Sequence, residues 1–484
     1  MFDNLDNEII GFCNNIKINS TPLYIFKNIK SLNSTNLITD KQKHFLTSAF
    51  QLETDHFGFF PDENSNLAGA VAIIKNSSEL RKSIIDQAAE ISKKVPKRKW
   101  AVQNIDNIEE KEIYNFFLGW GLSFYQFKLD KPKIKSEVQT LCLNTIRTLI
   151  NKDLHDRCIA ELKGIFLTRN LINLPPNILT PKNYIEFIRK FLKPFGSQIS
   201  TYEGEKLKNN FPLINFVGRS SENKPALIDI KWNNDKKKES PTIVLIGKGV
   251  TFDSGGLDIK PSNSMLLMKK DMGGSAVVLG IGYALMSMNY PVNLRIIIPL
   301  AENAVSEKSM RPMDIIYSRN KTPVEIGNTD AEGRLLLADA LLFSQEGKDN
   351  NDFIIDFATL TGAARVALGT ELPALFTNDD DLGNSIVSSG IEQIDPVWRM
   401  PLFSPYERFL ETSYEAISST GNAGTGGAIT AALFLKKFIN PNTKWAHIDL
   451  MAWNNNSRPG FPSGGEAMGL RNIVNMIINH CNKR

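Results

Sequence analysis

Short apolar runs alternate with amphipathic stretches along roughly the first 130 residues. Four of the runs predict β-strands, at 23–26, 67–74, 100–102 and 122–127. Between them, the segment 77–94 repeats apolar residues at the spacing of one buried helix face and stops before Pro96, so it predicts a helix. Alternating strands and helices predict a small N-terminal α/β domain.

The second half of the chain repeats this alternation with longer apolar runs. Strand-like segments lie at 226–232, 242–246, 294–298, 353–357 and 447–451, and Ala-rich helical segments lie at 274–288, 332–344 and 428–438. The polar loop 233–240 joins the first two strands, which predicts a hairpin with a solvated tip at Lys236–Lys238. We therefore predict a larger C-terminal α/β domain with a central mixed sheet flanked by helices.

A basic segment that contains proline, Lys128–Lys135, indicates a domain boundary. Residues 136–173 then contain glycine only at Gly164 and no proline, which predicts a connecting segment that is mostly helical. The predicted organisation is an N-terminal domain at 1–135, a connecting segment at 136–173 and a C-terminal domain at 174–484.

Composition narrows the class of protein. The 484 residues include 42% hydrophobic and 22% charged residues, which is typical of a folded globular chain, and the net charge of +4 gives no electrostatic reason to expect a nucleic-acid or membrane partner. The four cysteines form no CxxC pair, the N-terminus is acidic where a secretory signal is basic, and no apolar run reaches about 18 residues. We expect a cytoplasmic protein.

Four carboxylates lie at the ends of predicted elements. The buried strand that ends at Ile246 runs into a glycine-rich loop with Lys248 and Asp253, and Asp271, Asp330 and Glu332 precede helices. Each carboxylate alone could cap a helix. Together they are hard ligands that two divalent cations would balance, an arrangement used both for peptide and for phosphoester hydrolysis.

These segments, in this order, resemble the leucine aminopeptidase (cytosol aminopeptidase) family of dinuclear metallopeptidases. The most specific match is the octapeptide NTDAEGRL at Asn328–Leu335. The resemblance covers roughly residues 170 to 450 and also takes in the segments 173–177, 247–256, 259–261, 271–274, 310–312, 359–362, 378–380 and 426–435. It implies hydrolysis of the first residue from peptides with a free amino terminus.

The resemblance also implies a role for each matching residue. The ligands of two cations, zinc or manganese, are Lys248, Asp253, Asp271, Asp330 and Glu332. The catalytic residues are Lys260, which polarises the scissile carbonyl, and Arg334, which holds a bicarbonate that shuttles protons. The substrate side chain and backbone meet Met268, Thr359, Leu360 and Gly362. A homohexamer is implied as well.

One departure from the family pattern bears on specificity. The strand at 447–451 leads into Met451 and Trp453, bulky residues where the family has small ones, so both are expected in the floor of the side-chain pocket. Two alternatives to the aminopeptidase are a dinuclear phosphoester hydrolase and a family member that serves as a non-catalytic scaffold or DNA-binding protein. The octapeptide and the lysine ligand argue against the first, and the intact catalytic positions argue against the second.

Overall fold

The computed structural model describes residues 11–13, 20–52, 56–75, 77, 82–106, 108–129, 138–142, 149–233, 240–347 and 351–483. The chain divides into two compact units, the first mainly Asp3–Lys163 with Asn456–Ser463 and the second mainly Gly164–Asn455 with Gly464–Arg484. The division falls within helix α7 (Lys152–Asn173). The boundary predicted at residue 135 lies outside the described residues.

The first unit contains a six-stranded sheet in the order β1-β6-β5-β2-β4-β3, parallel except for β3. The strands are β1 (Phe12–Cys13), β2 (Thr21–Phe26), β3 (Phe57–Pro61), β4 (Leu67–Ile73), β5 (Lys99–Asn104) and β6 (Thr140–Cys142). The helices are α1 (Ile29–Ser34), α2 (Asp40–Ala49), α4 (Ile84–Lys94) and α5 (Glu110–Leu122). The predicted N-terminal α/β character is confirmed.

Three sequence-based predictions for this unit need correction. Helix α4 begins at Ile84 rather than near Ser77, because Ser83 and Asp86 form a capping box there. Leu122–Phe127 is not a strand: Leu122 ends the apolar helix α5, and Ser123 caps it. Strand β6 lies at Thr140–Cys142, where the pattern predicted helix, because it pairs in parallel with β1 and β5. The conformation of these segments depends on caps and on distant partners.

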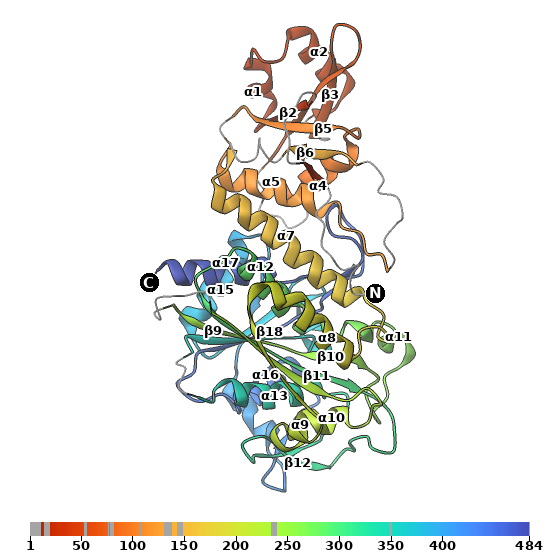
Figure 1. Ribbon diagram of the computed structural model, residues 1–484, viewed down its shortest axis with the longest axis vertical. Helices are drawn as coiled ribbons and strands as arrows, with labels where there is room; N and C mark the ends of the chain where they lie inside the picture. The colour runs from red at the N-terminus through yellow and green to blue at the C-terminus, as the bar shows by residue number, and fades with distance from the viewer. Residues whose placement is uncertain are drawn as a thin grey trace. The chain divides into compact units, whose positions relative to one another are not determined.

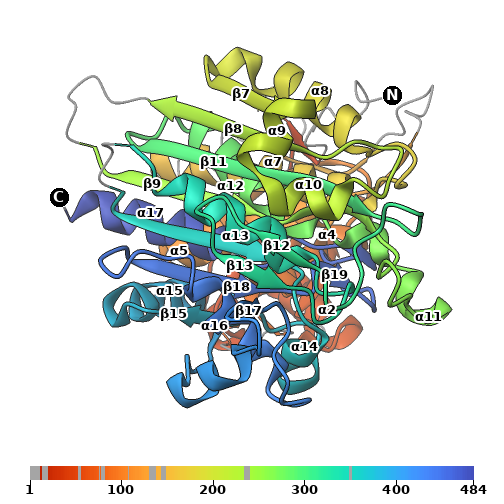
Figure 2. The same ribbon diagram turned by 90° about the horizontal axis from the view of Figure 1, so that it is seen from below.

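The second unit contains a mixed sheet in the order β16-β15-β18-β14-β9-β11-β8-β7, with β10 paired to β11 (Figure 1, Figure 2). Its centre, β18-β14-β9-β11, is parallel, whereas β8 and β7 are antiparallel to their neighbours. The strands are β7 (Gln198–Glu203), β8 (Ala226–Asn233), β9 (Thr242–Gly247), β10 (Gly249–Asp253), β11 (Asn293–Asn303), β14 (Phe353–Ala358), β15 (Ala374–Thr377), β16 (Trp398–Arg399) and β18 (Trp445–Asp449). The predicted mixed sheet is confirmed.

Helices cover both faces of this sheet. Helix α12 packs on β9 and β14 and is joined on that face by α17 and α15, whereas α13, α16 and α10 lie on the opposite face (Figure 1). The helices of the unit are α8 (Pro181–Leu192), α9 (Gly204–Asn210), α10 (Pro212–Gly218), α11 (Ser262–Met265), α12 (Gly273–Ser287), α13 (Gly333–Ser344), α14 (Gly362–Leu368), α15 (Asp380–Glu392), α16 (Gly427–Lys436) and α17 (Leu470–Asn482). Short strands form two further small sheets, β12 (Ile315–Tyr317), β13 (Pro323–Glu325) and β17 (Ile417–Ser418) in one, and β19 (Trp453–Asn454) and β20 (Gly464–Gly465) in the other.

The hairpin predicted from β8 and β9 is wrong. Strand β11 lies between them, antiparallel to β8 and parallel to β9. Both β9 and β11 are apolar and almost completely buried, so each is stabilised by neighbours on both sides, and the pairing is set by that burial rather than by the short connection. The lysines predicted for the tip of the hairpin lie outside the described residues.

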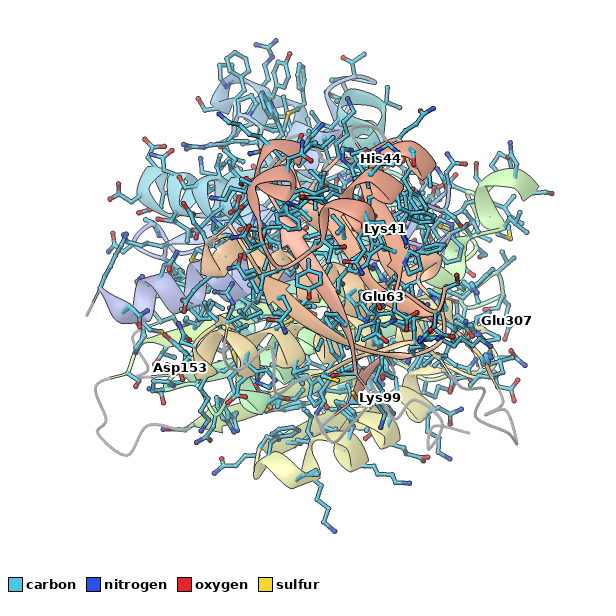
Figure 3. All side chains as sticks on the ribbon, turned by 90° about the horizontal axis from the view of Figure 1, so that it is seen from above. Lys41, His44, Glu63, Lys99, Asp153 and Glu307 are labelled. Atoms are coloured by element: carbon cyan, nitrogen blue, oxygen red, sulfur yellow. The ribbon has the colours of Figure 1, made fainter. Side chains whose placement is uncertain are left out.

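Charged side chains of both signs lie on the surface of the first unit. Lys41 and His44 of α2 and Glu63, in the turn after β3, are exposed (Figure 3).

Among the residues that the structure describes, no helix is long and apolar enough to cross a membrane.

Candidate metal centre and substrate cavity

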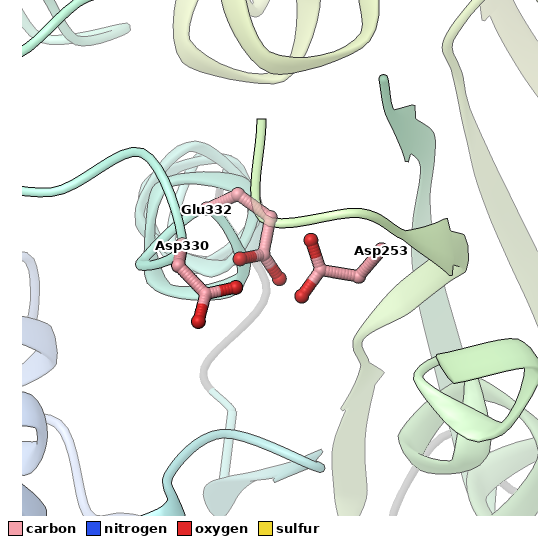
Figure 4. A group of neighbouring side chains, drawn as sticks. All are labelled: Asp253, Asp330 and Glu332. Carbon is pink, nitrogen blue, oxygen red and sulfur yellow. The ribbon is translucent and has the colours of Figure 1, made fainter. Parts of the chain in front are cut away.

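Three of the predicted carboxylates meet at one edge of the mixed sheet. Asp253 is the last residue of β10, whereas Asp330 and Glu332 lie in the loop just before α13. Each side chain offers an oxygen atom, and these three atoms lie within 4.8 Å of one another (Figure 4). The octapeptide loop is therefore brought against the end of β10, as the sequence predicted for ligands at strand ends.

Two lysines join the carboxylates. Lys248 Nζ, which is almost completely buried, lies 2.7 Å from Asp271 Oδ2 and 2.9 Å from Glu332 Oε1. Lys260 Nζ lies 2.8 Å from Asp253 Oδ2 and also contacts Asp330. Four carboxylates thus share two ammonium groups, which leaves two negative charges without a counter-charge in this cluster when all six groups are ionised.

The pKa values reflect this crowding of negative charge. Burial, reinforced by Asp271, raises the pKa of Asp253 to about 6, and burial together with Asp253 raises the pKa of Glu332 well above its ordinary value. Burial lowers the pKa of Lys248, but the attraction of Asp271 and Glu332 outweighs it and the net pKa is raised. A divalent cation at this position would favour the ionised carboxylates, so the donor set fits a metal site.

Backbone and side-chain contacts fix the orientation of these groups. Thr359 accepts a hydrogen bond from Lys248 Nζ through its carbonyl oxygen (3.0 Å) and donates one from Oγ1 to Asp271 Oδ1 (2.7 Å). Gly333 leaves room for Lys248, because a Cβ at that position would lie 2.5 Å from the lysine Cε. The glycine of the octapeptide is therefore required by close packing.

Sequence reasoning missed Asn303. This buried residue ends β11, opposite Asp253 in the parallel pairing, and its Nδ2 donates to Asp253 Oδ1 at 2.9 Å and to the Thr329 carbonyl oxygen at 3.1 Å. It therefore ties the first carboxylate to the octapeptide loop. Asn303 could have been found from its position as a polar residue at the end of an apolar run, which forms the strand next to the strand that carries Asp253.

Arg334 lies on the first turn of α13 and is also buried. Its Nη1 donates to the Ser419 carbonyl oxygen at 2.5 Å, and its Nε is buried without a hydrogen-bond partner among the described residues. Burial lowers the pKa of Arg334 to about 10, which leaves it charged at neutral pH.

A cavity of about 410 Å³ opens beside the carboxylates. All predicted site residues except Arg334 line it, namely Lys248, Asp253, Lys260, Met268, Asp271, Asp330, Glu332, Thr359, Leu360 and Gly362. Met451 also lines the cavity, as the sequence predicted. Trp453 does not belong to the lining; its ring lies 5.5 Å from Lys269 Nζ instead, so its expected place in the pocket floor is wrong.

Comparison with known proteins agrees with this geometry. Residues 166–474 match the profile of the cytosol aminopeptidase family, catalytic domain. The chain belongs to this family. It is 37% identical over 373 residues to a probable cytosol aminopeptidase of Wolbachia pipientis wMel, which covers 75% of this chain and 74% of that protein. It is likewise 37% identical over 368 residues to the cytosol aminopeptidase of Rickettsia prowazekii (strain Madrid E), covering 74% and 73% of the two chains.

Solved structures of this fold extend the likeness to nearly the whole chain. The crystal structure of the cytosol aminopeptidase from Coxiella burnetii matches with a TM-score of 0.85 and 36% identity, over 97% of this chain and 99% of that one. The bottromycin maturation enzyme BotP in complex with Mn matches with a TM-score of 0.82 and 26% identity, over 96% and 100%. Family membership makes the chain a metal-dependent aminopeptidase, a hydrolase that acts on peptide bonds.

Proposed function

We propose that this aminopeptidase works with two divalent cations, zinc or manganese, bound by Lys248, Asp253, Asp271, Asp330 and Glu332. The observation that carries the proposal is the convergence of three carboxylate oxygens within 4.8 Å. The raised pKa values of Asp253 and Glu332 support it, because a cation would relieve the repulsion that causes them. Hard carboxylate oxygens suit manganese and carboxylate-rich zinc sites, and a manganese complex is known for the similar BotP.

A pair of divalent cations supplies Lewis acidity, which makes water nucleophilic near neutral pH. The residues of the chain do the remaining work. The Lys260 ammonium keeps its proton, because Asp253 and Glu332 outweigh burial and raise its pKa, and it donates to the carbonyl oxygen as negative charge develops there. Lys248 would give up its proton only in exchange for a cation, since Asp271 and Glu332 hold that proton.

Arg334 holds an anion that carries protons in this proposal. Among the residues that the structure describes, no histidine lines the cavity, so the proposal takes the general base from another source. The hydrogen bond to Ser419 fixes one end of the guanidinium, and the buried Nε remains as a donor for a bicarbonate ion. Met268, Thr359, Leu360 and Gly362 surround the first residue of a peptide whose amino terminus is free.

The two alternatives have less support. A dinuclear phosphoester hydrolase would share the paired cations, but family membership favours peptide hydrolysis. A non-catalytic scaffold or DNA-binding role has no support in the site, where every predicted ligand lines one cavity. A homohexamer and a cytoplasmic location belong to the proposal through the family name and the resemblance.

Metal analysis and hydrolysis of leucyl anilide test this proposal together. After chelation and dialysis the enzyme should lose activity, and manganese or zinc should restore it as occupancy approaches two ions per chain. Full activity in the chelated enzyme, or saturation at a single ion, would contradict the two-cation site.

A further inference from the structure

Two adjacent lysines next to the metal centre have different surroundings. Lys269 and Lys270 both belong to the short 3-10 turn Met268–Lys270. Lys269 Nζ donates to the Asn173 carbonyl oxygen at 2.8 Å and lies 5.5 Å from the Trp453 ring centroid. Lys270 is buried and lines the substrate cavity. Of these two lysines, only Lys270 lines the cavity.

The ammonium group of Lys270 has no hydrogen bond and no ion pair within the described part of the chain, and the residue is only 5% exposed. The acidic groups that favour the charged form of Lys270 are Asp271 and Asp449, and both already bind other groups. Asp271 binds Lys248 and Thr359, and Asp449 accepts hydrogen bonds from the Leu360 and Thr361 amides and from Thr361 Oγ1. A mostly buried lysine whose ammonium group has no ion-pair partner favours a ligand that brings a negative charge to it.

A second cation, Arg365 of α14, lines the same cavity and is close enough to Lys270 to disfavour its charged form. Arg365 Nη1 lies 3.8 Å from Met451 Sδ, and Met451 also lines the cavity. Lys270 and Arg365 thus contribute two positive charges to the lining of one cavity. Like charges near one another favour an anion between them.

We propose that the side-chain pocket selects an acidic first residue, glutamate or aspartate, whose carboxylate pairs with Lys270 and Arg365. This inference rests on the proposed aminopeptidase site, because the pocket is defined relative to the metal ligands. Glutamine and asparagine fill the same volume without the charge, so they provide the reference substrates. Leucine, which has similar bulk, tests whether an apolar side chain is preferred.

The test measures kcat/KM of the manganese-loaded, full-length enzyme on glutamyl, glutaminyl and leucyl anilides. The wild-type enzyme should prefer glutamyl to glutaminyl anilide by about 10- to 100-fold, the range for one hydrogen bond to a charged group. Lys270→Met, which keeps the length of the side chain, should bring this ratio close to one. The matched control Lys269→Met should leave the ratio unchanged.

Arg365→Gln offers a second variant on an exposed residue, so folding is not at risk. It should lower the glutamyl-to-glutaminyl ratio by a smaller factor, since exposed charges are screened. Equal wild-type rates for glutamyl and glutaminyl anilide, or a wild-type ratio in folded Lys270→Met, overturn the acidic pocket.

Two further comparisons distinguish the acidic pocket from failure of the proposed function and from binding of a peptide C-terminus. Hydrolysis of leucyl and glutaminyl anilides without a preference for glutamyl anilide refutes only the acidic pocket, whereas no hydrolysis of any unblocked anilide refutes the proposed function as well. Anilides lack a terminal carboxylate. Faster cleavage of Ala-Ala than of Ala-Ala-amide, with equal glutamyl and glutaminyl rates, would therefore assign the two cations to the C-terminus of a dipeptide and overturn the proposal.

Discussion

The substitution Gly333→Ala tests the packing of the proposed metal centre. Gly333 is the first residue of α13 and directly follows Glu332. A Cβ at this position would lie 2.5 Å from Cε and 2.7 Å from Nζ of Lys248. These distances are shorter than van der Waals contact, so the lysine must move away from Asp271, Glu332 and the Thr359 carbonyl oxygen, which now lie 2.7, 2.9 and 3.0 Å from its amine.

The expected magnitudes follow from this overlap. Overpacking a tightly filled site costs about 1 to 3 kcal/mol, and alanine regains up to about 1 kcal/mol over glycine through helix propensity. The free energy of unfolding should therefore fall by about 0 to 3 kcal/mol. Gly333→Ala shifts Lys248 but does not remove it. Metal binding should therefore weaken by about 10- to 100-fold, the range found when the groups that orient metal ligands are lost.

The assay is the manganese activation curve of the chelated enzyme with leucyl anilide, followed together with thermal unfolding. A matched control is Gly427→Ala, since Gly427 is also the first residue of a helix, α16, but a Cβ there meets only Ala363 Cβ at 3.4 Å. We expect a shift to higher manganese concentration in Gly333→Ala and none in Gly427→Ala. A wild-type activation curve in Gly333→Ala would refute the tight packing of Lys248 as a ligand.

Three further outcomes are expected. N-acetyl-leucyl anilide should be inert, because its blocked amine cannot bind the metal centre, and cleavage at the rate of leucyl anilide would contradict an aminopeptidase mechanism. Lys248→Arg should lose one cation because arginine does not deprotonate. Lys260→Ala should keep both cations and lower kcat by about 10²- to 10³-fold. Metal analysis together with kcat checks this pair, and two cations in Lys248→Arg or a lost cation in Lys260→Ala would show that the roles are reversed. Met451→Ala should improve kcat/KM for larger neutral first residues, by about 1 to 3 kcal/mol per methylene accommodated, and an unchanged ranking of Ala, Leu, Met and Phe anilides would show that Met451 does not limit the pocket.

The apolar patterns predicted most of the central strands but not how they pair. Burial of β9 is visible in its sequence, because a continuous apolar run is typical of a strand covered on both faces. Its partners are β11 and β14, which lie about 50 and 110 residues further along the chain. A short polar loop favoured the adjacent β8 instead. The hairpin prediction failed because non-local burial determined the order of the sheet.

The residues that line the cavity could be predicted more completely than the strand order, because the carboxylates belong to a specific motif at the ends of strands and helices. Asn303 escaped because its role depends on the register that sets it opposite Asp253. Lys269 and Lys270 are a second example, because the sequence alone does not tell which of two adjacent lysines lines the cavity. One 3-10 turn carries Lys269 to the Asn173 carbonyl oxygen and Trp453 while Lys270 stays among the cavity walls. In the acidic pocket that we propose, specificity for the first residue depends on which of these two neighbouring side chains faces the cavity, and only the folded backbone determines this.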